Sequence, residues 1–92
     1  MRDIDTIIES LVTAHVGIAV EQLKVVHPGA DDDGLWFFRH PFSSVEVQLE
    51  SSNGQCPFAF ESDASPLATT AHTVTEAITL ISNGLGVRAP SA

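Results

Sequence analysis

Apolar and polar residues alternate within residues 34 to 63, and this pattern predicts three consecutive antiparallel strands. Successive side chains of a strand point to opposite faces, so residues two apart share a face. One of these faces is predicted to be apolar and to form the inner side of a sheet. Its members are Trp36, Phe38, Val47, Leu49, Phe58 and Phe60.

Asn53-Gly54 predicts a two-residue turn between the second and third of these strands. Both central residues of a type I′ turn need positive φ, which asparagine tolerates and glycine adopts freely. The resulting pairs are Leu49 with Phe58, Val47 with Phe60, Gln48 with Ala59 and Glu46 with Glu61.

The first two strands are predicted to be joined by a four-residue loop, Pro41 to Ser44. The resulting pairs are Trp36 with Leu49, Phe37 with Gln48, Phe38 with Val47, Arg39 with Glu46 and His40 with Val45. A slip of one residue would turn Trp36 and Phe38 outward, so the apolar pattern favours this register.

A helical stripe precedes the strands and ends near Gly17. Asp3 or Asp5 is the predicted cap, and Thr6 with Glu9 has the spacing of a capping box. The stripe consists of Ile4, Ile7, Ile8, Leu11, Val12, His15 and Val16.

A second helix is predicted to begin at Thr73, with Glu76 in capping-box spacing, and to end at Asn83-Gly84. Its buried stripe is predicted to contain Val74, Ala77, Ile78, Ile81 and Leu85.

The remaining segments complete an α-β-β-β-β-α order in one α+β domain, residues 1–92, with residues 86–92 as a frayed tail. Residues 18–22 are predicted to be a connector, 23–27 a strand and 64–72 a loop. Because the turn-rich segment 28–34 does not fix a register, the pairing of the 23–27 strand stays open. Both helices are expected to cover one face of a four-stranded antiparallel sheet.

The outer face of this sheet combines an aromatic centre with an acidic margin. Outward apolar residues on an antiparallel sheet indicate either a covered face or a binding patch. The pattern is compatible with a loop or an identical subunit that covers this face, and with a patch that binds another molecule. The predicted partner-binding residues are Leu35, Phe37, Arg39, Glu46, Gln48, Glu50, Glu61 and Asp63. Arg39 is expected to relieve the repulsion between Glu46 and Glu61, an exposed interaction of about 0.2 to 1 kcal/mol.

Charge narrows the class of partner. The 92 residues contain 12 Asp and Glu against 4 Lys and Arg, a net charge of −8. Such a chain repels nucleic-acid phosphates and anionic membranes. A basic protein partner or a cation is compatible with this charge.

Candidate catalytic and metal-binding groups are weakly supported. Cys56 and His40 fall at opposite ends of the predicted strands, too far apart for a nucleophile and its base. Asp31, Asp32 and Asp33 lie between His27 and His40 but lack the spacing of a calcium loop or a zinc helix. We therefore assign no catalytic residue, cofactor or metal, and whether these residues bind a metal stays open.

The single cysteine, the acidic N-terminus and the lack of a long apolar run predict a cytoplasmic protein. The leading functional hypothesis is a non-enzymatic module that engages a basic protein through its sheet face or acidic loop. Immunity proteins, inhibitors and chaperones illustrate this electrostatic principle. The alternative is a small metal-dependent or thiol- or histidine-based hydrolase that uses residues around 27–40.

Overall fold

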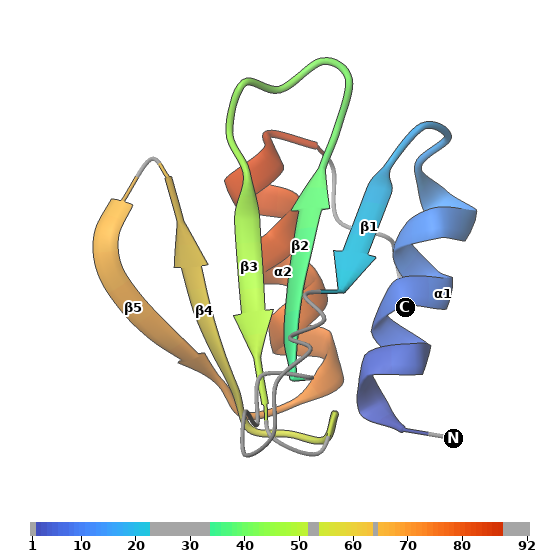
Figure 1. Cartoon of the computed structure of the whole chain (residues 1–92). Helices are drawn as coiled ribbons and strands as arrows, with labels where there is room; N and C mark the ends of the chain where they lie inside the picture. The colour runs from blue at the N-terminus through green and yellow to red at the C-terminus, as the bar shows by residue number, and fades with distance from the viewer. Residues whose placement is uncertain (1, 23–33, 52–53, 64, 88–92) are drawn as a thin grey trace, which may run out of the picture.

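The computed structural model is a two-layer arrangement in which two helices cover one face of a five-stranded antiparallel sheet (Figure 1). The described residues are 2–22, 34–51, 54–63 and 65–87. The elements in chain order are α1 (Asp3–Ala14), β1 (Ala19–Gln22), β2 (Leu35–Arg39), β3 (Val47–Glu50), β4 (Phe58–Ser62), β5 (Ser65–Ala71) and α2 (Val74–Leu85).

The α+β class and the antiparallel sheet are confirmed, whereas the expected number of strands is wrong. The spatial order β1-β2-β3-β4-β5 follows the chain order, so each strand pairs with the next along the sequence. The described residues form five strands where the whole chain was expected to have four, and the predicted strand 23–27 lies outside them.

β1 forms where a connector was expected. Its residue Glu21 pairs with Phe37 of β2, and Ala19 pairs with Arg39. Ile18 and Val20 pack against the core, while Ala19 and Glu21 are exposed. This alternation is the mark of a strand, but it covers too few residues to stand out in the sequence.

β5 forms where a loop was expected. Ala71 is fully buried opposite Phe58, and Thr70 lies opposite Ala59. A register shift interrupts the pairing between Phe60 and Ser62. Threonine suits a strand, but the small residues around it supply little apolar signal.

The pairing of β2 with β3 is confirmed, and the pairing of β3 with β4 differs from the prediction by two residues. Trp36 lies opposite Leu49, as expected. Leu49, however, lies opposite Phe60 and not Phe58. Because side chains alternate with a period of two, this shift changes the cross-strand neighbours and leaves each residue on its predicted face.

The shift arises because residues 54–57 fold over the start of α1 before β4 begins at Phe58. Ile4 N donates to Gly54 O at 2.9 Å. Asp3 accepts from Cys56 N at 2.9 Å through Oδ2, and its own N–H donates to Gln55 Oε1 at 3.0 Å. These hydrogen bonds satisfy backbone groups at the beginning of the helix that have no partner within it.

The first residues of α1 differ from the predicted cap. The cap is Arg2, whose backbone N–H donates to Asp5 Oδ2 at 3.1 Å, so Thr6 and Glu9 do not form the box. The helix ends at Ala14, and Gly17 lies in the following turn with φ of 93°. Val12 and Val16, expected in the buried stripe, are exposed.

The predicted N-cap of α2 is observed, but Glu76 Oε2 accepts from His72 N at 3.1 Å rather than from Thr73 N, and the end of the helix differs from the prediction. Thr73 accepts from Glu76 N at 3.1 Å, which confirms the N-cap. The helix continues through Asn83 and Gly84 to Leu85 and is capped by Gly86, which has the left-handed conformation. Val87 N then donates to Ser82 O at 2.9 Å, so Gly86 and Val87 take part in this ending.

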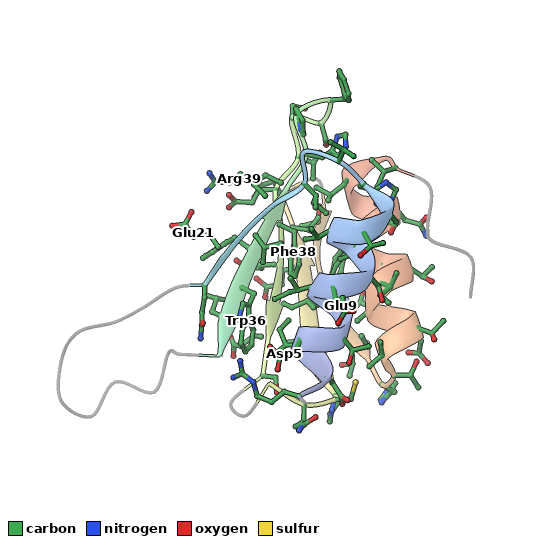
Figure 2. The ribbon with its side chains drawn as sticks, turned by 90° about the vertical axis from the view of Figure 1, so that its right-hand side faces the viewer. Asp5, Glu9, Glu21, Trp36, Phe38 and Arg39 are labelled. Carbon is green, nitrogen blue, oxygen red and sulfur yellow. The ribbon has the colours of Figure 1, made fainter. Side chains whose placement is uncertain are left out.

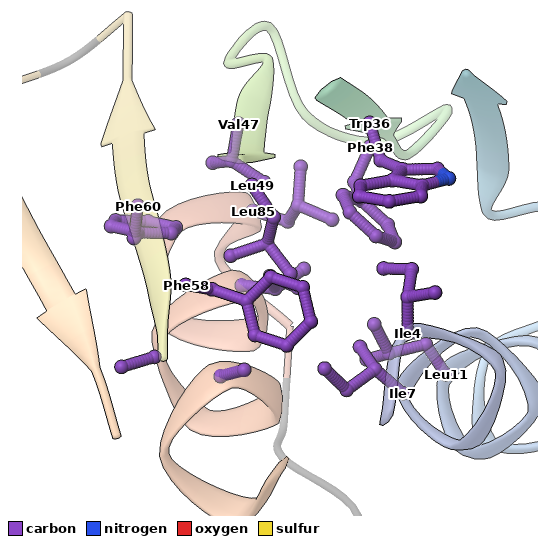
Figure 3. Close-up of a cluster of buried hydrophobic side chains, with 13 residues drawn as sticks. Ile4, Ile7, Leu11, Trp36, Phe38, Val47, Leu49, Phe58, Phe60 and Leu85 are labelled. Carbon is purple, nitrogen blue, oxygen red and sulfur yellow. The ribbon is translucent and has the colours of Figure 1, made fainter. Parts of the chain in front are cut away.

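The core lies between the sheet and the helices and contains the predicted inner face (Figure 3). Trp36 and Phe58 meet edge to face, with ring centroids 6.5 Å apart. The buried apolar residues are Ile4, Ile7, Leu11, Trp36, Phe38, Val47, Leu49, Phe58, Phe60, Ala71, Ala77, Ile81 and Leu85. Neither helix in the described part of the chain is long and apolar enough to cross a bilayer.

Candidate functional site

The helices pack on one side of the sheet and leave the other side without a covering layer among the described residues (Figure 1). Figure 2 shows Glu21 and Arg39 projecting from this outer side, away from both helices. We call the outward residues of β1 to β4 the outer face. It is formed by Ala19, Glu21, Leu35, Phe37, Arg39, Gln48, Glu50, Ala59 and Glu61, with Glu46 and Asp63 at its margin.

Leu35 and Phe37 are the apolar centre of the outer face. Both are half-buried, in contrast to Trp36 and Phe38, which are buried on the inner side. Phe37 has Glu21 and Gln48 as its cross-strand neighbours. An aromatic ring on an open sheet face is a surface that can contribute to binding.

Arg39 and Glu46 form an ion pair at one end of the outer face. The hydrogen bond to Glu46 and the charge of that carboxylate raise the pKa of the Arg39 guanidinium. Glu21 and Asp63 act in the same direction. The Arg39 guanidinium therefore lies among three carboxylates. They come from Glu21 of β1, from Glu46 just before β3 and from Asp63 in the turn that follows β4.

Glu61 does not share Arg39 with Glu46, contrary to the sequence-based prediction. Because of the two-residue shift, Glu61 lies opposite Gln48, whose Nε2 donates to Glu61 Oε2. Glu46 instead exchanges hydrogen bonds with Asp63: Glu46 N donates to Asp63 Oδ2 at 3.3 Å, and Asp63 N donates to Glu46 O at 3.1 Å.

A cleft of about 620 Å³ opens beside the Arg39–Glu46 pair. It is lined by Gly17, Ala19, Arg39, His40, Pro41, Ser43, Ser44, Val45, Glu46 and Asp63. A smaller hollow of about 90 Å³ lies between Glu46, Gln48, Glu61 and Asp63. Both depressions have carboxylates in their walls, so the margin of the outer face is concave and acidic.

Two exposed apolar side chains lie on the loops around this cleft. Val16, after α1, and Phe42, between β2 and β3, are each 93% exposed. Their loops meet where Gly17 approaches Pro41, since a Cβ on Gly17 would lie 3.1 Å from Pro41 Cγ. The rings of His15 and His40 are 6.3 Å apart in the same region.

The structure places all eight predicted partner-binding residues on the outer face or at its margin. It adds Glu21, which the sequence analysis missed because its segment was interpreted as a connector. The alternation of Ile18 and Val20 with Ala19 and Glu21 could have revealed it. This surface carries five carboxylates, from Glu21, Glu46, Glu50, Glu61 and Asp63, and a single guanidinium, that of Arg39.

Cys56 and His40 are not brought together. The pairing of the strands places Cys56, just before β4, at the end of the sheet opposite to His40, just after β2 (Figure 1). Cys56 lies beside Asp3, and burial together with that carboxylate raises the pKa of its thiol. A thiol that is held in its protonated form is a poor nucleophile.

The described residues contain no cluster of three or more His, Cys, Asp or Glu side chains that could hold a metal ion. His27 and the run Asp31 to Asp33 lie outside the described part of the chain. The hypothesis of a metal site around residues 27–40 therefore stays a prediction. Searches of known protein families, curated proteins and solved structures find no match to this chain.

Proposed function

We propose that this chain is a protein-binding module that engages a basic protein partner through the outer face. The observation that carries the proposal is the arrangement on that surface: Phe37 and Leu35 at the centre, and five carboxylates with one arginine around them. An apolar centre with a charged rim is the common anatomy of a protein interface.

Electrostatics favour a basic partner over a second copy on this face. Two outer faces brought together would set carboxylates of like charge against one another, and like-charge contacts cost several kcal/mol. A surface rich in Lys and Arg would be attracted, and its approach would be accelerated at low salt. The acidic cleft beside Glu46 and Asp63 could accept a basic side chain from such a partner.

The proposal includes the cytoplasmic location expected from the single cysteine, since one cysteine cannot form a disulfide within the chain and small secreted domains commonly depend on disulfides. The hydrolase alternative has no support from the described residues, where Cys56 and His40 lie apart.

The test is capture of a partner from an extract of the source cells by the immobilised chain, followed by affinity measurements on variants. Glu50→Lys reverses a charge on the outer face, and Glu9→Lys makes the same change on α1, on the helical side of the molecule (Figure 2). We expect Glu50→Lys to weaken binding at low salt and to matter less as salt screens the charges. Phe37→Ser should weaken binding at low and at high salt alike, because salt does not screen the contribution of buried apolar area.

Equal loss of binding in Glu9→Lys and Glu50→Lys would show that net charge, and not the outer face, determines capture. Recovery of no partner, together with stoichiometric metal in the purified protein, would favour the hydrolase alternative and reject the proposal.

A further inference from the structure

β5 is the longest strand of the described sheet and lies at its edge (Figure 1). Within the described residues, β4 is its only neighbouring strand. An edge strand presents a row of backbone N–H and C=O groups without sheet partners, and such a row is a template for another strand. The edge of β5 that faces away from β4 is therefore a place where a further strand could pair.

The devices that normally protect an edge strand are missing from the second half of β5. Natural edges are protected by charged side chains, by proline, or by bulges that twist the edge away. In β5, Pro66 and the register shift between Phe60 and Ser62 both lie toward its beginning. Thr69–Ala71 has none of these features, and its pairing with β4 is regular.

β5 also carries no charged residue, in a chain with a net charge of −8. The opposite edge strand, β1, carries Glu21, and the outer face carries five carboxylates. Two copies of an acidic chain repel one another wherever carboxylates meet. β5 is a strand at which two copies can approach without that cost.

A groove of about 300 Å³ runs beside β5, between the strand and α2. Its walls are mainly threonines of both elements together with Leu80, and Glu76 is the only charged residue among them. The carboxylate of Glu76 already accepts from His72 N at 3.1 Å. Next to the unprotected backbone there is thus a mostly uncharged depression that a neighbouring molecule could fill.

We infer that two copies of this chain pair edge to edge through β5, with Thr69–Ala71 of one copy antiparallel to the same residues of the other. Threonine then lies near threonine across the new ladder, a favourable pairing in strands. A two-fold axis perpendicular to the sheet is the operation that relates antiparallel edge strands in this way. Both outer faces consequently lie on the same side of the doubled sheet and stay available to a basic partner.

Sedimentation velocity of the purified full chain, from the micromolar to the millimolar range, tests the inference. We expect a concentration-dependent dimer that tightens as added salt screens the net negative charge. Thr70→Lys places an edge-protecting lysine on β5 and should raise the dissociation constant at least about tenfold. The matched control is Thr13→Lys, at an exposed position of α1. It reduces the net negative charge equally and should leave the dimer as tight or tighter.

Hydrogen exchange of the unmodified chain gives a second measurement that does not depend on a variant folding. We expect amides of Thr69–Ala71 to become better protected as concentration rises. A chain that stays monomeric at every concentration would overturn the inference, as would a dimer that Thr70→Lys does not weaken. Protection of these amides only when another protein is added would also overturn it and would indicate a foreign strand at β5.

Discussion

Gly84 of α2 lies directly against Val47 of β3. A Cβ on Gly84 would come within 2.6 Å of Val47 Cγ1 and 3.2 Å of Phe60 Cζ. The first distance is shorter than any ordinary contact between carbon atoms. The glycine that the sequence suggested as the end of the helix instead lies inside it and allows the close approach of α2 to the sheet.

Gly84→Ala should lower the free energy of unfolding by up to about 2 kcal/mol. Alanine gains about 1 kcal/mol in helix propensity, but forcing a methyl group into a packed core typically costs about 1 to 3 kcal/mol. Val47 is fully buried and cannot move aside into solvent. Urea denaturation monitored by Trp36 fluorescence measures the change.

The double variant Val47→Ala/Gly84→Ala isolates this contact. Removal of Val47 Cγ1 makes room for the added methyl group, so the double variant should be more stable than the sum of the single changes predicts. A coupling of about 0.5 to 3 kcal/mol is typical of residues in contact. Additive effects would show that α2 does not pack against β3 as closely as the structure indicates.

The faces of the central strands could be predicted from the sequence because alternation of apolar residues determines them. Trp36 and Phe38 are buried and Phe37 is only half-buried, as the pattern indicated. The acidic character of the outer face followed from the same alternation. What alternation cannot fix is a shift by two residues, since such a shift preserves every face.

The missed strands and the altered register have tertiary causes. The hydrogen bonds between the first residues of α1, Asp3 and Ile4, and residues 54–56 join segments about fifty residues apart, and no local pattern predicts them. β5 is built largely from small residues that become a strand because β4 lies beside it. The cleft at Arg39 likewise depends on the contact between the Gly17 and Pro41 loops.

The register of β3 and β4 can be tested with engineered disulfides in a Cys56→Ser background. Glu50 lies opposite Ala59, so the pair Glu50→Cys/Ala59→Cys should form a disulfide on mild oxidation. The pair Gln48→Cys/Ala59→Cys is opposed only in the tight-hairpin register and should stay reduced. Mass spectrometry of thiol-blocked samples distinguishes the two, and the reverse result would restore the Asn53-Gly54 turn.

Asp5 should make the stability of α1 depend on pH. The hydrogen bonds from the Arg2 side chain and backbone lower the pKa of the Asp5 carboxyl. A folded-state pKa below the unfolded value of about 3.9 adds stability above that pH, and the stability is lost as pH falls through the folded value. The difference in stability between the unmodified chain and Asp5→Asn should therefore shrink on acidification.

Arg2→Gln is the control for this prediction, because it removes the guanidinium and keeps the backbone donor. Its pH dependence, measured by thermal unfolding in low-salt buffers, should lie between those of the unmodified chain and Asp5→Asn. An unchanged difference between the unmodified chain and Asp5→Asn at every acidic pH would contradict the role of the Arg2–Asp5 contact.

Cys56 should react slowly with alkylating reagents at neutral pH. Burial raises the pKa of its thiol, and the hydrogen bond with Asp3 and the charge of that carboxylate raise it further. The thiolate is the reactive form, so the pH midpoint of the alkylation rate should lie above that of an ordinary thiol. Asp3→Asn keeps the side-chain volume and removes the charge, so it should lower this midpoint. Asp3→Glu keeps the charge and should lower the pH midpoint less than Asp3→Asn does. Equal midpoints in the two variants would show that burial alone determines the reactivity of Cys56.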